Sequence, residues 1–274
     1  MAKIVGGFLL PHDPLVTANP DAPSKEQGDA VRGGFAHVAR RLEELEVDTV
    51  IVVGDDHYTI FGPHCLPPYL IVIGEASGPV EPWVGLPHEP FRINQPLASH
   101  IMQHGFDNGA DWAVAKSITL DHSTSLPIHL CIQDKPGISV IPVLINSGVE
   151  PLISNRRCHK LGQQLRAAVQ AWQGSERVAI LGTGGISHWV GMKDMGRVNV
   201  EWDKMIMAAV ERGDAEAIIA LSDEEIIRES GNGGLEIKNW LVALGFIDQF
   251  KGEVIEYQAV NEWVTGCGFM EIAA

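Results

Sequence analysis

Four histidines share one sequence context, and this pattern is the first sign of chemistry in the chain. His12, His57, His122 and His188 each follow an apolar run of the kind that forms a buried strand. The clearest run, TVIVV at 49–53, breaks at a glycine and then reads Asp-Asp-His. Because ligands of open α/β sheets bind beyond the carboxyl ends of the strands, the four histidines are expected to share one polar pocket. His57 taken alone could equally be an ordinary loop histidine.

Two imidazoles and one carboxylate commonly hold a first-row metal that keeps coordination positions open. Five acidic residues could supply the carboxylate: Asp13, Asp55, Asp56, Asp121 and Glu236. Glu236 is the most suggestive, because it follows the GNGG segment at 231–234 and opens an expected helix. A favourable interaction with the helix dipole gives a purely structural reason for an acid at that position. The residues alone leave both interpretations open.

Other motifs are weaker. The segment GTGGIS at 182–187 lacks the third glycine of G-x-G-x-x-G and the Gly-Lys-Ser/Thr of a phosphate-binding loop. Ser187 is not in a G-x-S-x-G elbow, because Trp189 replaces the second glycine. His100 and His104 have a helical spacing that can bind zinc, but the glutamate of H-E-x-x-H is missing, so a solvated helix face is the better interpretation.

The elements that would position these residues alternate between strands and helices. Strands are predicted at 3–10, 49–53, 69–73, 112–116, 138–145, 178–181, 254–260 and 267–272, and helices at 25–45, 97–104, 158–172, 199–228 and 235–244. Pro142 indicates an edge strand or a bulge. If the first two strands are parallel neighbours, they bring His12 and His57 to one edge. The order predicts a single α/β domain over residues 1–274, with a mostly parallel or mixed central sheet and helices on both faces.

Composition narrows the class of protein. The net charge of -15 argues against nucleic acid as a partner, which requires a basic surface. No apolar run approaches the roughly 20 residues of a membrane helix, and the first residues lack a signal-peptide cleavage site. The four cysteines are scattered without a C-x-x-C pair, which favours a reduced, cytoplasmic protein.

Taken together, five short motifs resemble those of the class III extradiol ring-cleavage dioxygenases, the family of the protocatechuate 4,5-dioxygenase β subunit. The motifs are PHDP at 11–14, DDH at 55–57, DHS at 121–123, GTGGISH at 182–188 and GLE at 234–236. They span nearly the whole chain in the same order and at similar spacing. GTGGISH about fifty residues before GLE is the most specific part.

The resemblance implies Fe(II) bound by His12, His57 and Glu236. It implies that His188 is the acid/base residue beside the substrate hydroxyl and oxygen, and that His122 is a second pocket histidine that positions or protonates the substrate. The implied reaction opens a catechol-type ring beside its diol with O2, in the breakdown of aromatic compounds. A histidine suits proton transfer because its pKa lies near neutrality.

The chain departs from the protocatechuate enzymes at 261–267, where small polar residues would meet a substrate carboxylate. Trp263 and Glu262 in that segment favour a smaller or neutral ring: a simple catechol, an aminophenol or a dihydroxypyridine. No segment resembles the small helical lid subunit, so a homo-oligomer or a separate lid chain is expected. Two alternatives are a metal-free structural or binding member of the same fold, and a Zn-dependent hydrolase that uses the same histidines.

Overall fold

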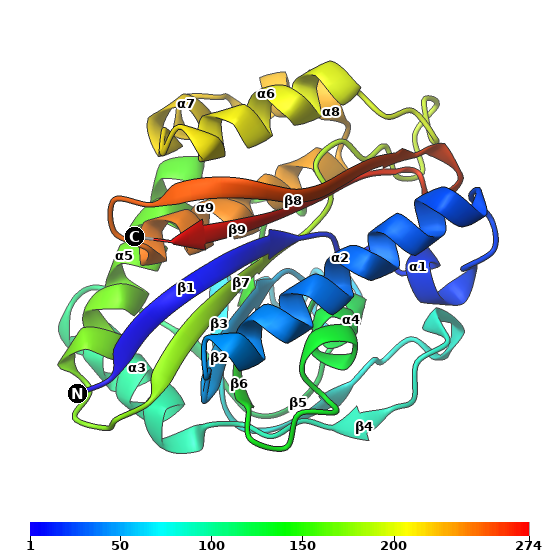
Figure 1. The fold of residues 1–274 in the computed structure, drawn as a ribbon. Coiled ribbons are helices and arrows are strands. Elements are labelled where there is room, and N and C mark those ends of the chain that lie inside the picture. Colours follow the sequence, from blue (N-terminus) through cyan, green and yellow to red (C-terminus); the bar gives the residue numbers. More distant parts are fainter. Residues whose placement is uncertain (274) are drawn as a thin grey trace.

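One mixed β-sheet forms the centre of the molecule in the computed structural model, which describes residues 1–273 (Figure 1). Its strands are β1 (Lys3–Leu10), β2 (Thr49–Gly54), β3 (Tyr69–Gly78), β4 (Glu89–Pro90), β5 (Ala113–Thr119), β6 (Ser139–Ile145), β7 (Arg177–Thr183), β8 (Lys251–Val260) and β9 (Thr265–Ala273). The spatial order is β4-β3-β6-β2-β7-β1-β9-β8, and β5 pairs with β3.

The four central strands β6, β2, β7 and β1 are parallel. On one side β3 joins β6 in antiparallel orientation, and on the other side β9 joins β1 and β8 joins β9, also antiparallel. Every residue of β2 is buried, as its continuous apolar sequence predicts for a strand covered on both faces. The predicted α/β class with a mixed central sheet is confirmed.

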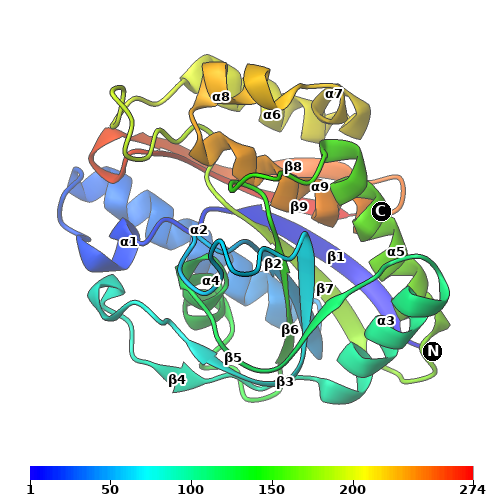
Figure 2. The same cartoon turned by 180° about the vertical axis from the view of Figure 1, so that it is seen from behind.

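Helices cover both faces of this sheet, as predicted (Figures 1 and 2). They are α1 (Leu15–Ala18), α2 (Lys25–Glu44), α3 (Gln95–Asp107), α4 (His122–Cys131), α5 (Asn155–Ala171), α6 (Val200–Glu211), α7 (Ala215–Ile219), α8 (Asp223–Ser230) and α9 (Ile237–Phe246), with short 3-10 turns η1 (Pro82–Val84), η2 (Gly233–Glu236) and η3 (Asn261–Trp263). α2 and α4 pack on one face, and α3, α5 and α9 on the other. No helix within residues 1–273 is long and apolar enough to cross a membrane.

Two features of the sheet differ from the possibilities that the sequence raised. β1 and β2 are not neighbours, because β7 lies between them and pairs with both. The strand with Pro142 is not at an edge, because β6 lies between β3 and β2. The pairing between β6 and β3 ends at Val143, which pairs with Ile71. Pro142 therefore lies just beyond this pairing, where its missing N–H leaves no bond to β3 unmade.

Local helix signals were mostly reliable. The side chain of Ser24 caps α2 by accepting from the backbone N–H of Gln27. The predicted helix at 199–228 is three helices, each capped by a side chain, from Asn199, Asp214 and Ser222. α4 was not predicted. Its sequence has Pro127 in the middle and no clear amphipathic period, and it forms because eight of its ten residues are buried by the surrounding structure.

Glycines allow α5 and α9 to pack very closely. A β-carbon on Gly162 of α5 would overlap the carbonyl oxygen of Val242, and one on Gly245 of α9 would overlap the carbonyl oxygen of His159. The backbones are therefore in direct contact, with no side chain between them. This contact fixes α9, and with it Glu236, which immediately precedes that helix.

We expect Gly162→Ala to lower the free energy of unfolding by about 1–3 kcal/mol, because the added methyl forces the two backbones apart. Urea denaturation of the purified protein measures the change. Gly33→Ala in α2 is the matched control, because a β-carbon there meets no atom within 4 Å. That control should be neutral or stabilising by about 0.5–1 kcal/mol. Equal stability of wild type and Gly162→Ala would show that the helices tolerate separation.

Candidate active site

The predicted metal-binding residues converge at the carboxyl edge of the parallel strands. The Nε2 atom of His12 lies 3.2 Å from Oε2 of Glu236, and Nε2 of His57 lies 3.4 Å from Oε1 of the same carboxylate. The two imidazoles meet edge to face with ring centroids 5.1 Å apart. His12 and Glu236 are buried, and the side chain of His57 is 29% exposed. Residues 12, 57 and 236 thus form one cluster, as the sequence predicted.

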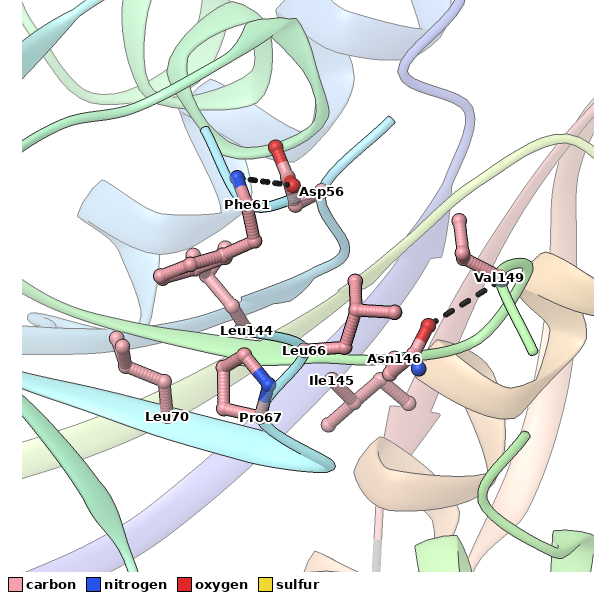
Figure 3. Close-up of a pocket in the computed structure, with 9 residues that line it drawn as sticks. All are labelled: Asp56, Phe61, Leu66, Pro67, Leu70, Leu144, Ile145, Asn146 and Val149. Atoms are coloured by element: carbon pink, nitrogen blue, oxygen red, sulfur yellow. Dashed lines mark hydrogen bonds between the residues drawn. The ribbon is translucent and has the colours of Figure 1, made fainter. Parts of the chain in front are cut away.

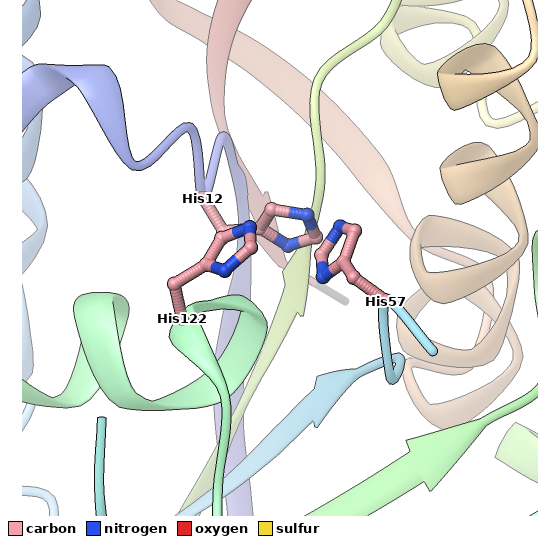
Figure 4. A group of neighbouring side chains, drawn as sticks. All are labelled: His12, His57 and His122. Atoms are coloured by element: carbon pink, nitrogen blue, oxygen red, sulfur yellow. The ribbon is translucent and has the colours of Figure 1, made fainter. Parts of the chain in front are cut away.

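The shared sheet edge explains the position of three of the four histidines. His12, His57 and His188 follow β1, β2 and β7, which are parallel and adjacent in the sheet. His122 arrives differently. Its preceding strand β5 runs parallel to β3 and therefore opposite to β2, so the edge rule does not apply to it. His122 is the first residue of α4, and the start of this helix places it in the cluster (Figure 4). Its ring stacks on the ring of His57 at a centroid distance of 4.2 Å.

Hydrogen bonds orient both candidate ligand imidazoles. The Nδ1 atom of His12 lies 3.0 Å from the hydroxyl of Thr183, and that hydroxyl also contacts two carbonyl oxygens, which can only accept. The arrangement favours a hydrogen on Nδ1 of His12 and a free lone pair on Nε2. Nδ1 of His57 donates to the carboxylate of Asp121 at 2.9 Å, which leaves its Nε2 free as well. Outer partners of this kind set the tautomer of metal-binding histidines.

The charges of the cluster suit a cation. Burial alone would lower the pKa of both imidazoles, but neighbouring carboxylates outweigh it and raise the pKa of His12 and, more strongly, of His57. Burial would raise the pKa of Glu236, but the two imidazoles hold it well below its usual range. Within the described residues, the buried Nε2 of His12 has the Glu236 carboxylate 3.2 Å away but forms no hydrogen bond of good geometry with it. A metal dication would satisfy that atom and displace the protons that the cluster attracts. The donor set therefore fits a metal ion.

The other candidate carboxylates are committed to different partners. Asp55 is the nearest: its Oδ1 lies 3.9 Å from His12 Nε2 and belongs to the same group of donor atoms, while its Oδ2 accepts the hydroxyl of Ser147 at 2.6 Å. Asp121 lies behind His57 and also caps α4. Asp13 accepts from the backbone of residue 15 and from the hydroxyl of residue 265.

Asp56 is not part of the histidine cluster. Its carboxylate accepts the backbone N–H groups of residues 59, 60 and 61, so it closes the loop after β2. It borders a separate hollow beside β3 and β6 that measures only about 20 Å³ and is lined mainly by apolar side chains (Figure 3). That hollow contains no histidine among the described residues, so it offers no alternative metal site.

His122 and His188 lie on the cavity with one ring nitrogen each held by the protein. Nδ1 of His122 lies 2.7 Å from the carboxylate of Glu81, and Nδ1 of His188 lies 2.8 Å from the carbonyl oxygen of Val264. Burial and the nearby charge of His57 lower the pKa of His122, which favours its neutral form. Both residues can therefore present Nε2 to a ligand. His100 and His104 are remote from this cavity, on α3.

The cluster opens into a cavity of about 300 Å³, near the lower end of the range typical of small-molecule sites. Its lining includes the four histidines and Glu236. The expectation that Trp263 and Glu262 shape this pocket was wrong. Trp263 is fully buried in the core on the α2 side of the sheet, and Glu262 is exposed. The next two residues, Val264 and Thr265, line the cavity instead.

Two positioning residues were missed from the sequence. Thr183 lies inside the GTGGISH motif, so its place directly after a buried strand was a usable signal. Glu81 lies in the Gly/Pro-rich loop after β3, where nothing local distinguishes it from other acids. Only the fold brings Glu81 to His122, 41 residues away.

A buried acid supports the segment that carries His188. Asp203 of α6 contacts the hydroxyls of Ser187 and Tyr257 at 2.9 and 2.8 Å. Ser187 immediately precedes His188, and its hydroxyl also accepts the backbone N–H of Asn199. Burial raises the pKa of Asp203 to about 7. Asp203 therefore holds its proton in the folded protein at pH values where an unfolded chain has lost it.

The contribution of Asp203 to the stability of the protein should consequently fall as pH rises from about 4 to about 7. Below pH 4 the carboxyl is protonated in both states, and between the two pKa values only the unfolded state releases its proton. We expect Asp203→Asn to reduce this loss by about 2 kcal/mol or more, since a tenfold change in proton affinity is worth about 1.4 kcal/mol. Urea denaturation at pH 5 and pH 8 measures it. An unchanged pH slope in the variant would contradict the raised pKa.

The fold and this cluster together define an α/β protein with a buried two-histidine, one-carboxylate site at the carboxyl edge of a parallel sheet. Residues 6–269 match the family model described as the catalytic LigB subunit of aromatic ring-opening dioxygenase. The chain therefore belongs to this family, the class III extradiol dioxygenases, and is a ring-cleavage dioxygenase. The predicted family and enzyme class are confirmed.

Individual relatives agree with this assignment. A 2,3-dihydroxyphenylpropionate/2,3-dihydroxicinnamic acid 1,2-dioxygenase of a Rhodococcus species is 23% identical, with 97% of each chain covered. The enzyme of the same name from Escherichia coli is 24% identical over 94% of this chain and 95% of its own length. The crystal structure of an uncharacterized protein of Escherichia coli K12 has the same fold, with a TM-score of 0.65, 13% identity, and coverage of 97% of this chain and 99% of that one.

Proposed function

We propose that this chain is an Fe(II)-dependent extradiol dioxygenase in which His12, His57 and Glu236 hold the metal. One observation carries the proposal: ring nitrogens of His12 and His57 and a carboxylate oxygen of Glu236 lie within 4.8 Å of one another, with Asp55 beside them. Two nitrogens and one carboxylate oxygen are the usual donors for non-haem iron with open positions. When bound, Fe(II) would supply the Lewis acidity and one-electron chemistry that ring opening by O2 requires.

The substrate class that we propose is an aromatic ring with two adjacent oxygens, or an oxygen and an amine. The names of the relatives contain a 2,3-dihydroxyphenyl group, which supports a vicinal diol here. Such a ring fits a cavity that has the metal donors at its base and two further histidines on its wall. O2 is the second substrate.

The two wall histidines would divide the proton chemistry. His122 favours its neutral form and is held by Glu81, so its Nε2 can accept a hydrogen bond from a substrate hydroxyl and fix the ring. His188 is held through Nδ1, so its Nε2 can take a proton from the diol and return it later in the cycle. Thr183 and Asp121 would keep the two ligand imidazoles in the tautomer that exposes Nε2.

The cluster also supports a second donor set. One ring nitrogen each of His12, His57 and His122 lies within 4.8 Å of the others, and three histidines are a known catalytic zinc set. A zinc hydrolase would use this set and leave Glu236 as an outer partner. A metal-free structural member would use neither set.

The test is metal-specific oxygen consumption. Protein stripped of metal is reloaded anaerobically with Fe(II) or Zn(II), and O2 uptake is recorded with catechol and with resorcinol. We expect uptake only with Fe(II) and catechol, because the two hydroxyls of resorcinol are not adjacent and cannot share one metal. O2 uptake with Zn(II) but not with Fe(II), or the absence of any metal binding, would reject the proposal. The mass of the active species in solution tests assembly as a homo-oligomer or with a small lid subunit.

A further inference from the structure

Apart from the metal donors and the two histidines His122 and His188, most of the cavity lining is apolar, and these apolar residues are called the apolar wall. It is formed by Leu15 of α1, Trp83 of η1, Val190 and Met195 of the loop after β7, and Val264 before β9. Trp83, Val190 and Met195 are 56%, 43% and 56% exposed, which is unusual for large apolar side chains. They gather at one cavity, so a ligand that enters it would cover them.

This wall offers no partner for an anion. Among the residues that the structure describes, no Lys or Arg lines the cavity, whereas the carboxylates of Asp13 and Glu236 do. The loop after β7 contains two basic residues, Lys193 and Arg197, but neither contributes to the lining. The guanidinium of Arg197 instead lies 4.8 Å from the ring centre of Trp189. A carboxylate placed against this wall would lose water without gaining an opposite charge.

We infer that the substituent on the aromatic ring of the substrate is uncharged and apolar, and that Leu15, Trp83, Val190, Met195 and Val264 form its subsite. The inference rests on the proposed function, because the diol end of the ring must occupy the metal donors for the substituent to reach this wall. Each methylene that becomes buried there should tighten binding by about two- to fourfold. A carboxylate at the same position should weaken it.

A matched pair of ligands tests this inference without relying on turnover. Anaerobic titration of the Fe(II)-loaded protein gives the Kd of 3-(2,3-dihydroxyphenyl)propionate and of its methyl ester, with catechol and 3-propylcatechol as references. We expect the ester to bind at least tenfold more tightly than the acid, and 3-propylcatechol to bind more tightly than catechol. Equal or tighter binding of the acid would overturn the inference. Failure of catechol itself to bind or to consume O2 would instead reject the proposed function.

A charge added to the wall should reverse the preference. Met195→Lys places a cation on the subsite, and we expect it to bind the acid at least tenfold more tightly than wild type does. Met192→Lys is the matched control, because Met192 belongs to the same loop and is 42% exposed but does not line the cavity. The control should change the Kd of the acid by less than twofold. Equal effects of the two lysines would show that net charge acts at long range and would overturn the assignment of the subsite.

Discussion

Glu236→Ala is expected to purify without iron and to bind Fe(II) at least 100-fold more weakly than wild type. The reason is that, within residues 1–273, Glu236 is the only carboxylate with an oxygen within 4.0 Å of a ring nitrogen of both His12 and His57, and Asp55 lies within that distance of His12 alone. Loss of a mere outer partner of a ligand lowers metal affinity by roughly 10–100-fold, so loss of a direct ligand should exceed that. Metal content after anaerobic loading and the Kd for Fe(II) are the measurements.

Asp203→Asn is the control for this result. It also removes a buried carboxylate, but Asp203 contacts Ser187 and Tyr257 and none of the metal donors. It should retain iron. Wild-type iron content in Glu236→Ala would reject the ligand assignment, and retention in Glu236→Ala together with loss in His122→Ala would identify the three-histidine set instead.

The pH dependence of Fe(II) binding adds a further check of the ligand assignment. Because the metal-free cluster raises the pKa of His12 and His57, Fe(II) affinity should increase with pH as these protons are lost.

His188→Ala is expected to keep iron and lose turnover by about 10²–10⁴-fold, the usual contribution of a general acid/base. His188 faces the cavity and its Nδ1 is fixed by the carbonyl oxygen of Val264, so its free nitrogen can exchange protons with the substrate. His188→Gln should be nearly as slow, because an amide keeps hydrogen bonding but cannot transfer a proton at neutral pH. The kcat for catechol, the iron content and the anaerobic Kd for catechol separate these effects.

A proton-transfer role predicts a particular pattern. Both His188 variants should bind catechol within a few-fold of wild type, and the pH profile of kcat should lose one limb. His64→Ala is the control, because His64 is exposed in a loop away from the cavity. It should leave kcat and its pH profile unchanged. Full activity of His188→Ala would remove this residue from the mechanism, and loss of iron would indicate a structural role.

Local sequence patterns predicted several elements closely. β1 has the bounds that were expected for the first strand, and the expected strand at 49–53 is β2 with one additional residue. Strong apolar runs and side-chain caps are short-range signals, so they can be read without the fold. The predicted boundaries were wrong where tertiary contacts determine the end of an element. β3 runs five residues beyond its predicted end, to Gly78, because its second half pairs with β4 and β5.

The sequence by itself determined the family, the strands that carry His12, His57 and His188, and the residue types that can hold a metal and move protons. The tertiary structure decided which of five acids meets the imidazoles. It inserted β7 between β1 and β2, so that Thr183 reaches His12, and it brought Glu81 to His122. In the folded chain Trp263 is buried, and Val264 lines the cavity instead. The physical reason is range: a strand or cap follows from neighbouring residues, whereas the partner of a buried polar atom follows from packing between segments up to 252 residues apart, as for Asp13 and Thr265.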